Sequence, residues 1–195
     1  FRRVLFRSGP QDLLVCNADD ARVMSRATAF AGRTVTFGES GGATVQALAI
    51  EDRGIAGMRA RVATPAGERV IETPLLGRGN LANVLAAIAV ALELNVPLDA
   101  IVSRAASLQP ADRRGTVRRL ARGVTVVDDS YNSSPAALKR ALDVIAKDET
   151  AARKVAVLGE MLELGEHSNA LHRESGRIAA ASGLQLLFAV GGAPA

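Results

Sequence analysis

The chain has 195 residues, of which 48% are hydrophobic, so it can bury the core of one large or two small domains. Aromatic residues are only 3% and the arginines behind a formal charge of +4 are scattered, which argues against a nucleic-acid partner. Cys16 is the only cysteine, which excludes an internal disulfide and favours a reducing, cytoplasmic compartment. No apolar run approaches the ~20 residues of a membrane helix, so we expect no membrane insertion.

The N-terminal part of the chain predicts strands separated by turns. Residues 1–9 are too short for a signal peptide and indicate a non-native or truncated lead-in. A buried strand is expected at 13–17, then a helix capped by Asp19 or Asp20 that runs to about Phe30, then a strand from Arg33 to Phe37.

The next segment predicts a hairpin-rich sheet followed by helices. Three strand-like runs lie at 43–51, 56–64 and 68–75, with glycine- and proline-containing turns between them. Residues 58–62 alternate between apolar and polar, so one face of that sheet should be open to water. Helices are expected at 80–94 and 99–108.

A change of composition at residues 109–115 predicts a linker between two domains, at 10–108 and 116–195. After the linker we expect a hairpin and then alternating helices and strands: strands 116–120 and 124–129, helix 135–147, strand 154–158, helix 167–182 and strand 185–190. This alternation indicates an α/β fold whose second domain is Rossmann-like, with a mostly parallel sheet.

Polar side chains gather where an apolar strand ends. The run from Val124 to Val127 leads into Asp128 and Asp129, and a polar turn then leads to Pro135 at the start of a helix. Open α/β sheets bind ligands at such strand tips. The alternative is a solvated acidic turn before a helix with proline in its first turn.

A second apolar strand runs into glycine and carboxylates. Residues 155–165 read Val-Ala-Val-Leu-Gly-Glu-Met-Leu-Glu-Leu-Gly, with His167 and His172 downstream. Glu160 and Glu163 are weaker site candidates, and a lone helical histidine such as His172 is more often structural than catalytic.

These two segments, with Gly-Arg-Gly-Asn-Leu-Ala-Asn at 77–83, resemble the Mur ligase family. The resemblance runs from about Leu13 to the C-terminus, and Tyr131-Asn132 favours the family members that join D-alanyl-D-alanine to UDP-N-acetylmuramoyl-tripeptide. It implies that 10–108 is the C-terminal part of a central ATP-binding domain and that 116–195 is a truncated C-terminal ligase domain.

The resemblance implies an ATP-dependent peptide ligase (EC 6.3.2 type) of peptidoglycan precursor synthesis. The substrate carboxylate would become an acyl phosphate, which the amine of D-alanyl-D-alanine then attacks, with ATP and Mg²⁺ as cofactors. We expect a cytoplasmic location and a monomer, although the sequence leaves the oligomeric state open. The sequence does not reveal which third residue the peptide substrate carries.

The resemblance also assigns residues to the nucleotide. Asn80 and Asn83 match asparagines that meet the adenine, whose edge suits an amide donor and acceptor. The alternative from the residues alone is that Asn80 caps a helix. Gly79 stands where the family usually has histidine.

The remaining candidates lie in the linker and in the segment after it. Arg114 matches an arginine that neutralises the γ-phosphate, unless it is merely a solvated linker residue or Arg113 takes its place. Asp129 matches the carboxylate that reaches the ribose, the alternative being a water-exposed strand end. Asn132 and Ser133 are candidates to hold the incoming dipeptide.

A Gly-x-x-x-x-Gly-Lys-(Ser/Thr) phosphate loop is absent from the sequence. The family's phosphate loop, most of its magnesium ligands and its uridine-nucleotide domain would lie upstream of Leu13, so we expect a fragment that is inactive alone. The alternatives are another Mur-type amino-acid ligase, a folate- or cyanophycin-type relative, or a noncatalytic nucleotide-binding α/β module.

Overall fold

The computed structural model describes residues 8–191, so most of the lead-in predicted at 1–9 lies outside the described residues. The chain divides into two compact units. The first unit runs to Asp52 and includes Met58–Pro74 and Arg78–Leu108. The second comprises Arg53–Gly57, Leu75–Gly77 and the chain from Gln109 onward.

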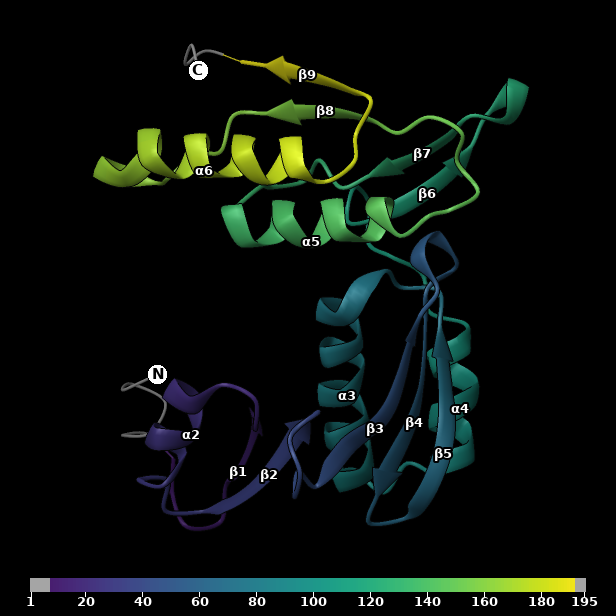
Figure 1. Cartoon of the computed structure of the whole chain (residues 1–195). Coiled ribbons are helices and arrows are strands. Elements are labelled where there is room, and N and C mark those ends of the chain that lie inside the picture. The colour runs from purple at the N-terminus through teal and green to yellow at the C-terminus, as the bar shows by residue number, and fades with distance from the viewer. Residues whose placement is uncertain (1–7, 192–195) are drawn as a thin grey trace. The chain divides into compact units, whose positions relative to one another are not determined.

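The first unit begins with a parallel strand pair joined by a helix. β1 (Leu13–Asn17) pairs with β2 (Arg33–Gly38), and α2 (Ala21–Ala27) connects them (Figure 1). Asp20 caps α2 because its side chain accepts hydrogen bonds from the backbone N–H groups of Arg22 and Val23. The helix ends before the predicted Phe30, because the N–H of Phe30 turns back to the carbonyl of Ala27.

Two hairpins complete the sheet. β3 (Val45–Asp52) pairs with β2 in parallel, and β4 (Met58–Thr64) and β5 (Gly67–Thr73) follow in antiparallel order. The strand order is therefore β1-β2-β3-β4-β5. A 3₁₀ turn at Gly54–Ala56 joins β3 to β4, where the sequence predicted turn residues. The predicted hairpins are confirmed.

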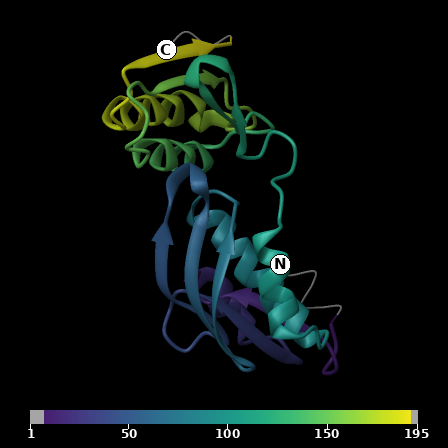
Figure 2. The same ribbon diagram turned by 90° about the vertical axis from the view of Figure 1, so that its right-hand side faces the viewer.

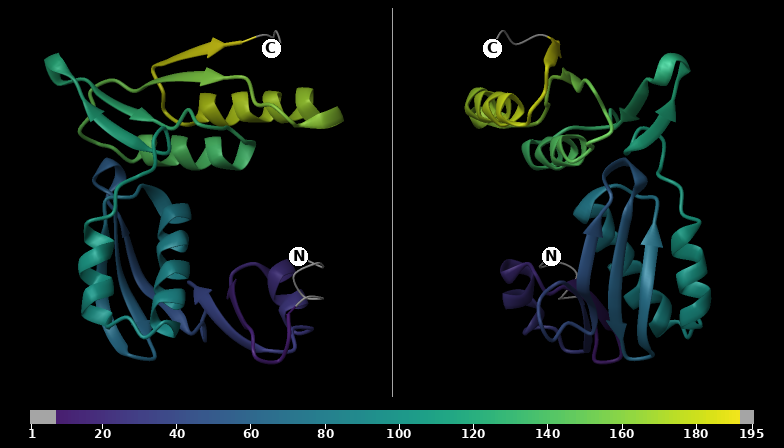
Figure 3. Two further views of the ribbon diagram at one scale, coloured as in Figure 1. Left: turned by 180° about the vertical axis from the view of Figure 1, so that it is seen from behind. Right: turned by 45° about the vertical axis from the view of Figure 1, so that its right-hand side comes forward.

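The alternation predicted at 58–62 separates a dry face from a wet one. Met58, Ala60 and Val62 are buried, whereas Arg59 and Arg61 are exposed and pair with glutamates of neighbouring strands. Two helices, α3 (Gly77–Glu93) and α4 (Leu98–Ala106), lie beside the strands (Figure 3). They add further apolar side chains to the core. Those side chains are Leu81, Val84, Leu85, Ile88, Ala89, Leu98, Ile101 and Ala105.

The second unit alternates strands and helices, as Figure 2 shows from green to yellow. An antiparallel pair comes first, β6 (Thr116–Arg119) and β7 (Thr125–Asp128), joined by a 3₁₀ turn at Ala121–Gly123. The chain continues through four further elements, α5 (Pro135–Ala146), β8 (Val155–Gly159), α6 (Ser168–Ala181) and β9 (Leu186–Val190). The predicted α/β class is confirmed.

The strands of the second unit form two separate two-stranded sheets within the described residues. β6 pairs with β7, and β8 pairs in parallel with β9. α5 and α6 pack side by side (Figure 1). Several apolar side chains of β8 and β9 stay exposed, including Val157 at 67%. None of the helices between residues 8 and 191 combines the length and hydrophobicity that a membrane span requires.

Candidate nucleotide and ligase site

Asp128 and Asp129, at the end of β7, have different surroundings, and Asp128 stabilises the turn that follows. Its Oδ1 accepts hydrogen bonds from the Ser130 hydroxyl at 2.7 Å and from the Ser130 N–H at 3.2 Å. The Ser130 hydroxyl, with help from the Ser130 N–H, Arg118 and Arg113, lowers the pKa of Asp128. Asp128 is thus an ionised residue whose hydrogen-bonding capacity is used by its own turn.

The pKa of Asp129 is shifted in the opposite direction. Desolvation by neighbouring atoms raises the pKa of Asp129, against the N–H of Gly115 and the charges of Arg114 and Arg140. Asp129 therefore differs from Asp128 in its surroundings, and its contact with the ribose hydroxyls stays a prediction.

Arg114 lies with Asp129 at this turn, on the face of Tyr131. The guanidinium carbon of Arg114 is 4.0 Å from the centroid of the Tyr131 ring. The guanidinium carbon of Arg113 is 5.9 Å away, and its Nε pairs with Asp112 at 3.4 Å. The two neighbouring arginines thus have different surroundings, and the role of Arg114 with the γ-phosphate stays a prediction.

Asn132 and Ser133 follow on the same turn. Asn132 Oδ1 accepts a hydrogen bond from the Ser133 N–H at 2.9 Å, which fixes the amide against the backbone. Ser134 then caps α5, its Oγ accepting from the N–H of Ala137 at 3.3 Å, and Pro135 occupies the first turn. The capped start of α5 thus fixes the end of this turn. The dipeptide contacts expected of Asn132 and Ser133 stay a prediction.

Asn80 and Asn83 lie in the first turns of α3. The helix begins at Gly77, so Asn80 lies inside it and the alternative of a capping role is wrong. One helical turn separates the two residues, and Asn83 Nδ2 lies 3.5 Å from Asn80 Oδ1. The side chains are half-buried and exposed, respectively, so both amides can meet a ligand. Their adenine contacts stay a prediction.

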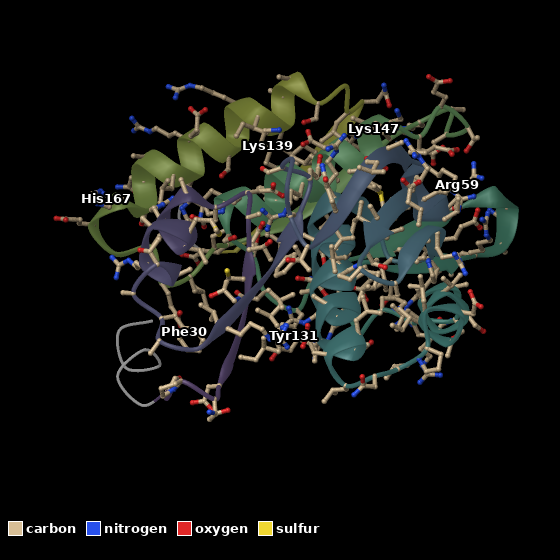
Figure 4. The ribbon with its side chains drawn as sticks, turned by 90° about the horizontal axis from the view of Figure 1, so that it is seen from below. Phe30, Arg59, Tyr131, Lys139, Lys147 and His167 are labelled. Carbon is tan, nitrogen blue, oxygen red and sulfur yellow. The ribbon has the colours of Figure 1, made fainter. Side chains whose placement is uncertain are left out.

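His172 has a structural role, as the sequence favoured. Its Nε2 accepts a hydrogen bond from the Met161 N–H at 3.1 Å. Its Nδ1 lies 2.8 Å from the Ser168 carbonyl, so Nδ1 carries the proton in this arrangement. The ring ties the loop after β8, in which Glu163 has a φ of 61°, to the first turn of α6. His167, labelled in Figure 4, has a side chain that is 73% exposed.

Two features were missed from the sequence. The sequence offered Asp19 and Asp20 equally as the helix cap. The Asp19 carboxylate instead accepts hydrogen bonds from the N–H groups of Glu39 and Ser40, at 2.9 and 2.8 Å. It also accepts one from the Ser40 hydroxyl at 2.6 Å. Glu39 in turn pairs with Arg78 of α3 at 2.5 Å. The Asp-Asp doublet and the glycine before Glu39 were the available signals. Tyr131 was only a family marker, and its contact with Arg114 was not foreseen.

A resident metal finds no ready-made site in the described part of the chain. Among residues 8–191, no three His, Cys, Asp or Glu side chains are grouped as a metal site requires. The expected Mg²⁺ ligands lie mostly upstream of Leu13, so the use of Mg²⁺ stays a prediction.

Comparison with known proteins places the chain in a family. The model described as "Mur ligase middle domain" matches residues 2–91, and that described as "Mur ligase, glutamate ligase domain" matches 113–195. The UDP-N-acetylmuramoyl-tripeptide--D-alanyl-D-alanine ligase of Escherichia coli (strain K12) is 38% identical over 128 residues, 66% of this chain. The UDP-N-acetylmuramoyl-L-alanyl-D-glutamate--2,6-diaminopimelate ligase of Alkalilimnicola ehrlichii is 39% identical over 138 residues, 67% of this chain. The chain spans only 28% and 27% of these relatives.

Solved structures agree with the sequence comparison. A crystal structure of MurF from Acinetobacter baumannii superposes with a TM-score of 0.86 at 30% identity, covering 97% of this chain and 41% of that one. MurF from Thermotoga maritima, in complex with ADP, gives 0.82 at 25% identity, covering 98% and 43%. The chain belongs to the Mur ligase family, and it carries parts of that family's middle and C-terminal domains.

Proposed function

We propose that the protein to which this chain belongs joins D-alanyl-D-alanine to UDP-N-acetylmuramoyl-tripeptide in peptidoglycan precursor synthesis, using ATP. The observation that carries the proposal is that Arg114 of the linker contacts Tyr131 on the turn after β7, the turn that also carries Asp129 and Asn132. The similarity to ligases of that name, one of them in complex with ADP, supports it. A cytoplasmic location and a monomeric state belong to the same proposal.

The residues suit an acyl-phosphate mechanism in which ATP supplies the phosphoryl group. Arg114 would neutralise charge that develops during the transfer. The Asp129 carboxylate would accept from the ribose hydroxyls, and the Asn80 and Asn83 amides would meet the adenine edge. Asn132, with Ser133, would hold the dipeptide whose amine attacks the acyl phosphate and displaces phosphate.

A second candidate is the addition of 2,6-diaminopimelate to UDP-N-acetylmuramoyl-L-alanyl-D-glutamate. The observation that favours it is the 39% identity to a ligase of that name, level with the identity to the first class. The Tyr131-Asn132 pair favours D-alanyl-D-alanine. The two candidates differ in both the nucleotide substrate and the amine, so one assay separates them.

The test is phosphate release by the full-length protein with ATP and each matched pair of substrates. We expect turnover with UDP-N-acetylmuramoyl-tripeptide and D-alanyl-D-alanine, and none with the dipeptide precursor and diaminopimelate. The reverse pattern would establish the second candidate, and turnover with neither pair would support a noncatalytic nucleotide-binding module. The 195-residue chain alone should release no phosphate, since its sequence lacks a phosphate loop.

A further inference from the structure

Tyr131 and Arg114 make a contact that is not part of a packed core. Tyr131 is 56% exposed, yet the guanidinium carbon of Arg114 stands 4.0 Å from the centre of its ring. That distance is well inside the ~6 Å within which a cation is attracted to an aromatic face. Tyr131 is labelled in Figure 4, and it is the only tyrosine of the chain.

The backbone brings the ring to the arginine. The Tyr131 N–H donates to the carbonyl of Arg113 at 3.1 Å, which links the linker to the turn after β7. Arg113 itself has a φ of 57°, in the left-handed region that non-glycine residues seldom adopt. This backbone arrangement places consecutive arginines in different surroundings, with Arg113 beside Asp112 and Arg114 on the ring.

An aromatic face holds a guanidinium differently from a carboxylate. A hydrogen-bonded carboxylate occupies the N–H donors of an arginine and offsets its charge. Asp112 lies 3.4 Å from Arg113 and 3.6 Å from Arg118, so it offsets the charges of both. A ring attracts the plane of the guanidinium, so the N–H donors at its edge stay available to a phosphate.

We propose that Tyr131 is a positioning residue that holds Arg114 on its ring face, beside Asp129, with the guanidinium edge free for the transferred phosphoryl group. The inference rests on the proposed role of Arg114. Restricting a long side chain before the reaction reduces the ordering needed during it, so the effect should appear in kcat.

The first test uses the full-length ligase. Tyr131→Leu should lower kcat and kcat/KM for ATP by about two- to fivefold, the factor that corresponds to one exposed cation–π contact. Tyr131→Phe should restore kcat relative to Tyr131→Leu, because the ring and not the hydroxyl makes the contact. Equal losses in the two variants, or no loss in Tyr131→Leu, would overturn the inference.

A double-mutant cycle separates this inference from the proposed function. In an Arg114→Ala background, Tyr131→Leu should cause no further loss, because Tyr131 acts through Arg114. The same loss in both backgrounds would overturn the inference and leave the role of Arg114 intact. Full activity of Arg114→Ala would overturn the role of Arg114 and the inference with it.

The contact can also be measured without catalysis. In NMR spectra of the 195-residue chain, the Tyr131 ring should shift the side-chain protons of Arg114 upfield. Tyr131→Leu should abolish that shift, and Tyr131→Phe should keep it. Arg114 side-chain shifts that are the same in the parent chain and in Tyr131→Leu would overturn the inference whatever the kinetics.

Discussion

The carboxylate of Asp19 occupies the space into which a side chain at Gly38 would project. A β-carbon added to Gly38 would lie 2.6 Å from Asp19 Oδ2, a separation that real β-carbons essentially never show. The same carboxylate holds the N–H groups of Glu39 and Ser40, so it cannot retreat without breaking those hydrogen bonds. The absence of a side chain at Gly38 is what lets the β1–α2 turn reach the loop after β2.

Gly38→Ala should therefore destabilise the fold by about 1–3 kcal/mol, the usual cost of forcing extra atoms into a filled space. Urea denaturation of the 195-residue chain, followed by circular dichroism, measures it. Gly41→Ala, in the same loop, is the control, because a β-carbon there meets nothing within 4 Å. Equal effects of the two substitutions would show that Asp19 does not constrain Gly38.

Asp19 should also make stability depend on pH. Burial would raise the pKa of Asp19, but the Ser40 hydroxyl and the N–H groups of Glu39 and Ser40 outweigh it and lower the pKa below the usual 3.8. A lowered folded-state pKa stabilises the fold above pH 3.8, and the contribution is lost as pH falls through the folded-state value. Asp19→Asn should thus be less stable than the parent chain at pH 7, with the gap closing below pH 3.8. A gap that stays constant from pH 7 to pH 3 would contradict this.

His172 offers a different stability test. Met161 is only 4% exposed, and its N–H donates to His172 Nε2. His172→Ala leaves that buried donor without its acceptor, so a loss of about 1–3 kcal/mol is expected. His167→Ala, at a side chain that is 73% exposed, should change stability by less than about 0.5 kcal/mol. Thermal unfolding of the two variants compares them directly, and similar midpoints would remove the structural role from His172.

Much of the fold follows from local sequence patterns. Apolar runs bounded by turn residues predicted the strands, and the alternation at 58–62 predicted which face of the sheet is wet, because side chains of a strand alternate by face. The sequence predicted that this helix begins at residue 80, whereas α3 begins three residues earlier, at Gly77. Gly77 and Gly79 are poor helix formers, and the packing of Leu81 and Leu85, which are 1% exposed, overrides that preference.

The site was harder to predict because its geometry depends on backbone segments that are distant in the sequence. Asp19 and Asp20 are equally good caps by residue type, and only the loop at 38–40 determines which of them caps α2. The stacking of Arg114 on Tyr131 likewise depends on the pairing of Arg113 with the turn after β7, which no local pattern encodes.

Asp129 and Asp128 should respond to the same substitution with opposite signs. Desolvation raises the pKa of Asp129, so its ionised form weakens the fold at pH 7, and Asp129→Asn should raise the thermal midpoint. The hydrogen bond from the Ser130 hydroxyl lowers the pKa of Asp128, so Asp128→Asn should lower the midpoint.

In the full-length ligase, Asp129→Asn should also reduce kcat/KM for ATP about tenfold or more, as expected for a lost hydrogen bond to a charged group. An unchanged kcat/KM for ATP would remove Asp129 from the nucleotide site.

Arg114 gives the sharpest test of the proposed chemistry, because its neighbour Arg113 is a matched control. Arg114→Ala in the full-length ligase should lower kcat about a hundredfold or more, the cost of removing one group that stabilises charge in the transition state. Arg114 is exposed and makes one exposed cation–π contact, so the free energy of unfolding should change by no more than about 1 kcal/mol. Arg113→Ala removes an equally exposed charge that pairs with Asp112, and it should keep kcat within about twofold. Steady-state phosphate release by the two variants decides: a larger loss in Arg113→Ala would move the assignment by one residue, and equal small losses would remove both arginines from the reaction.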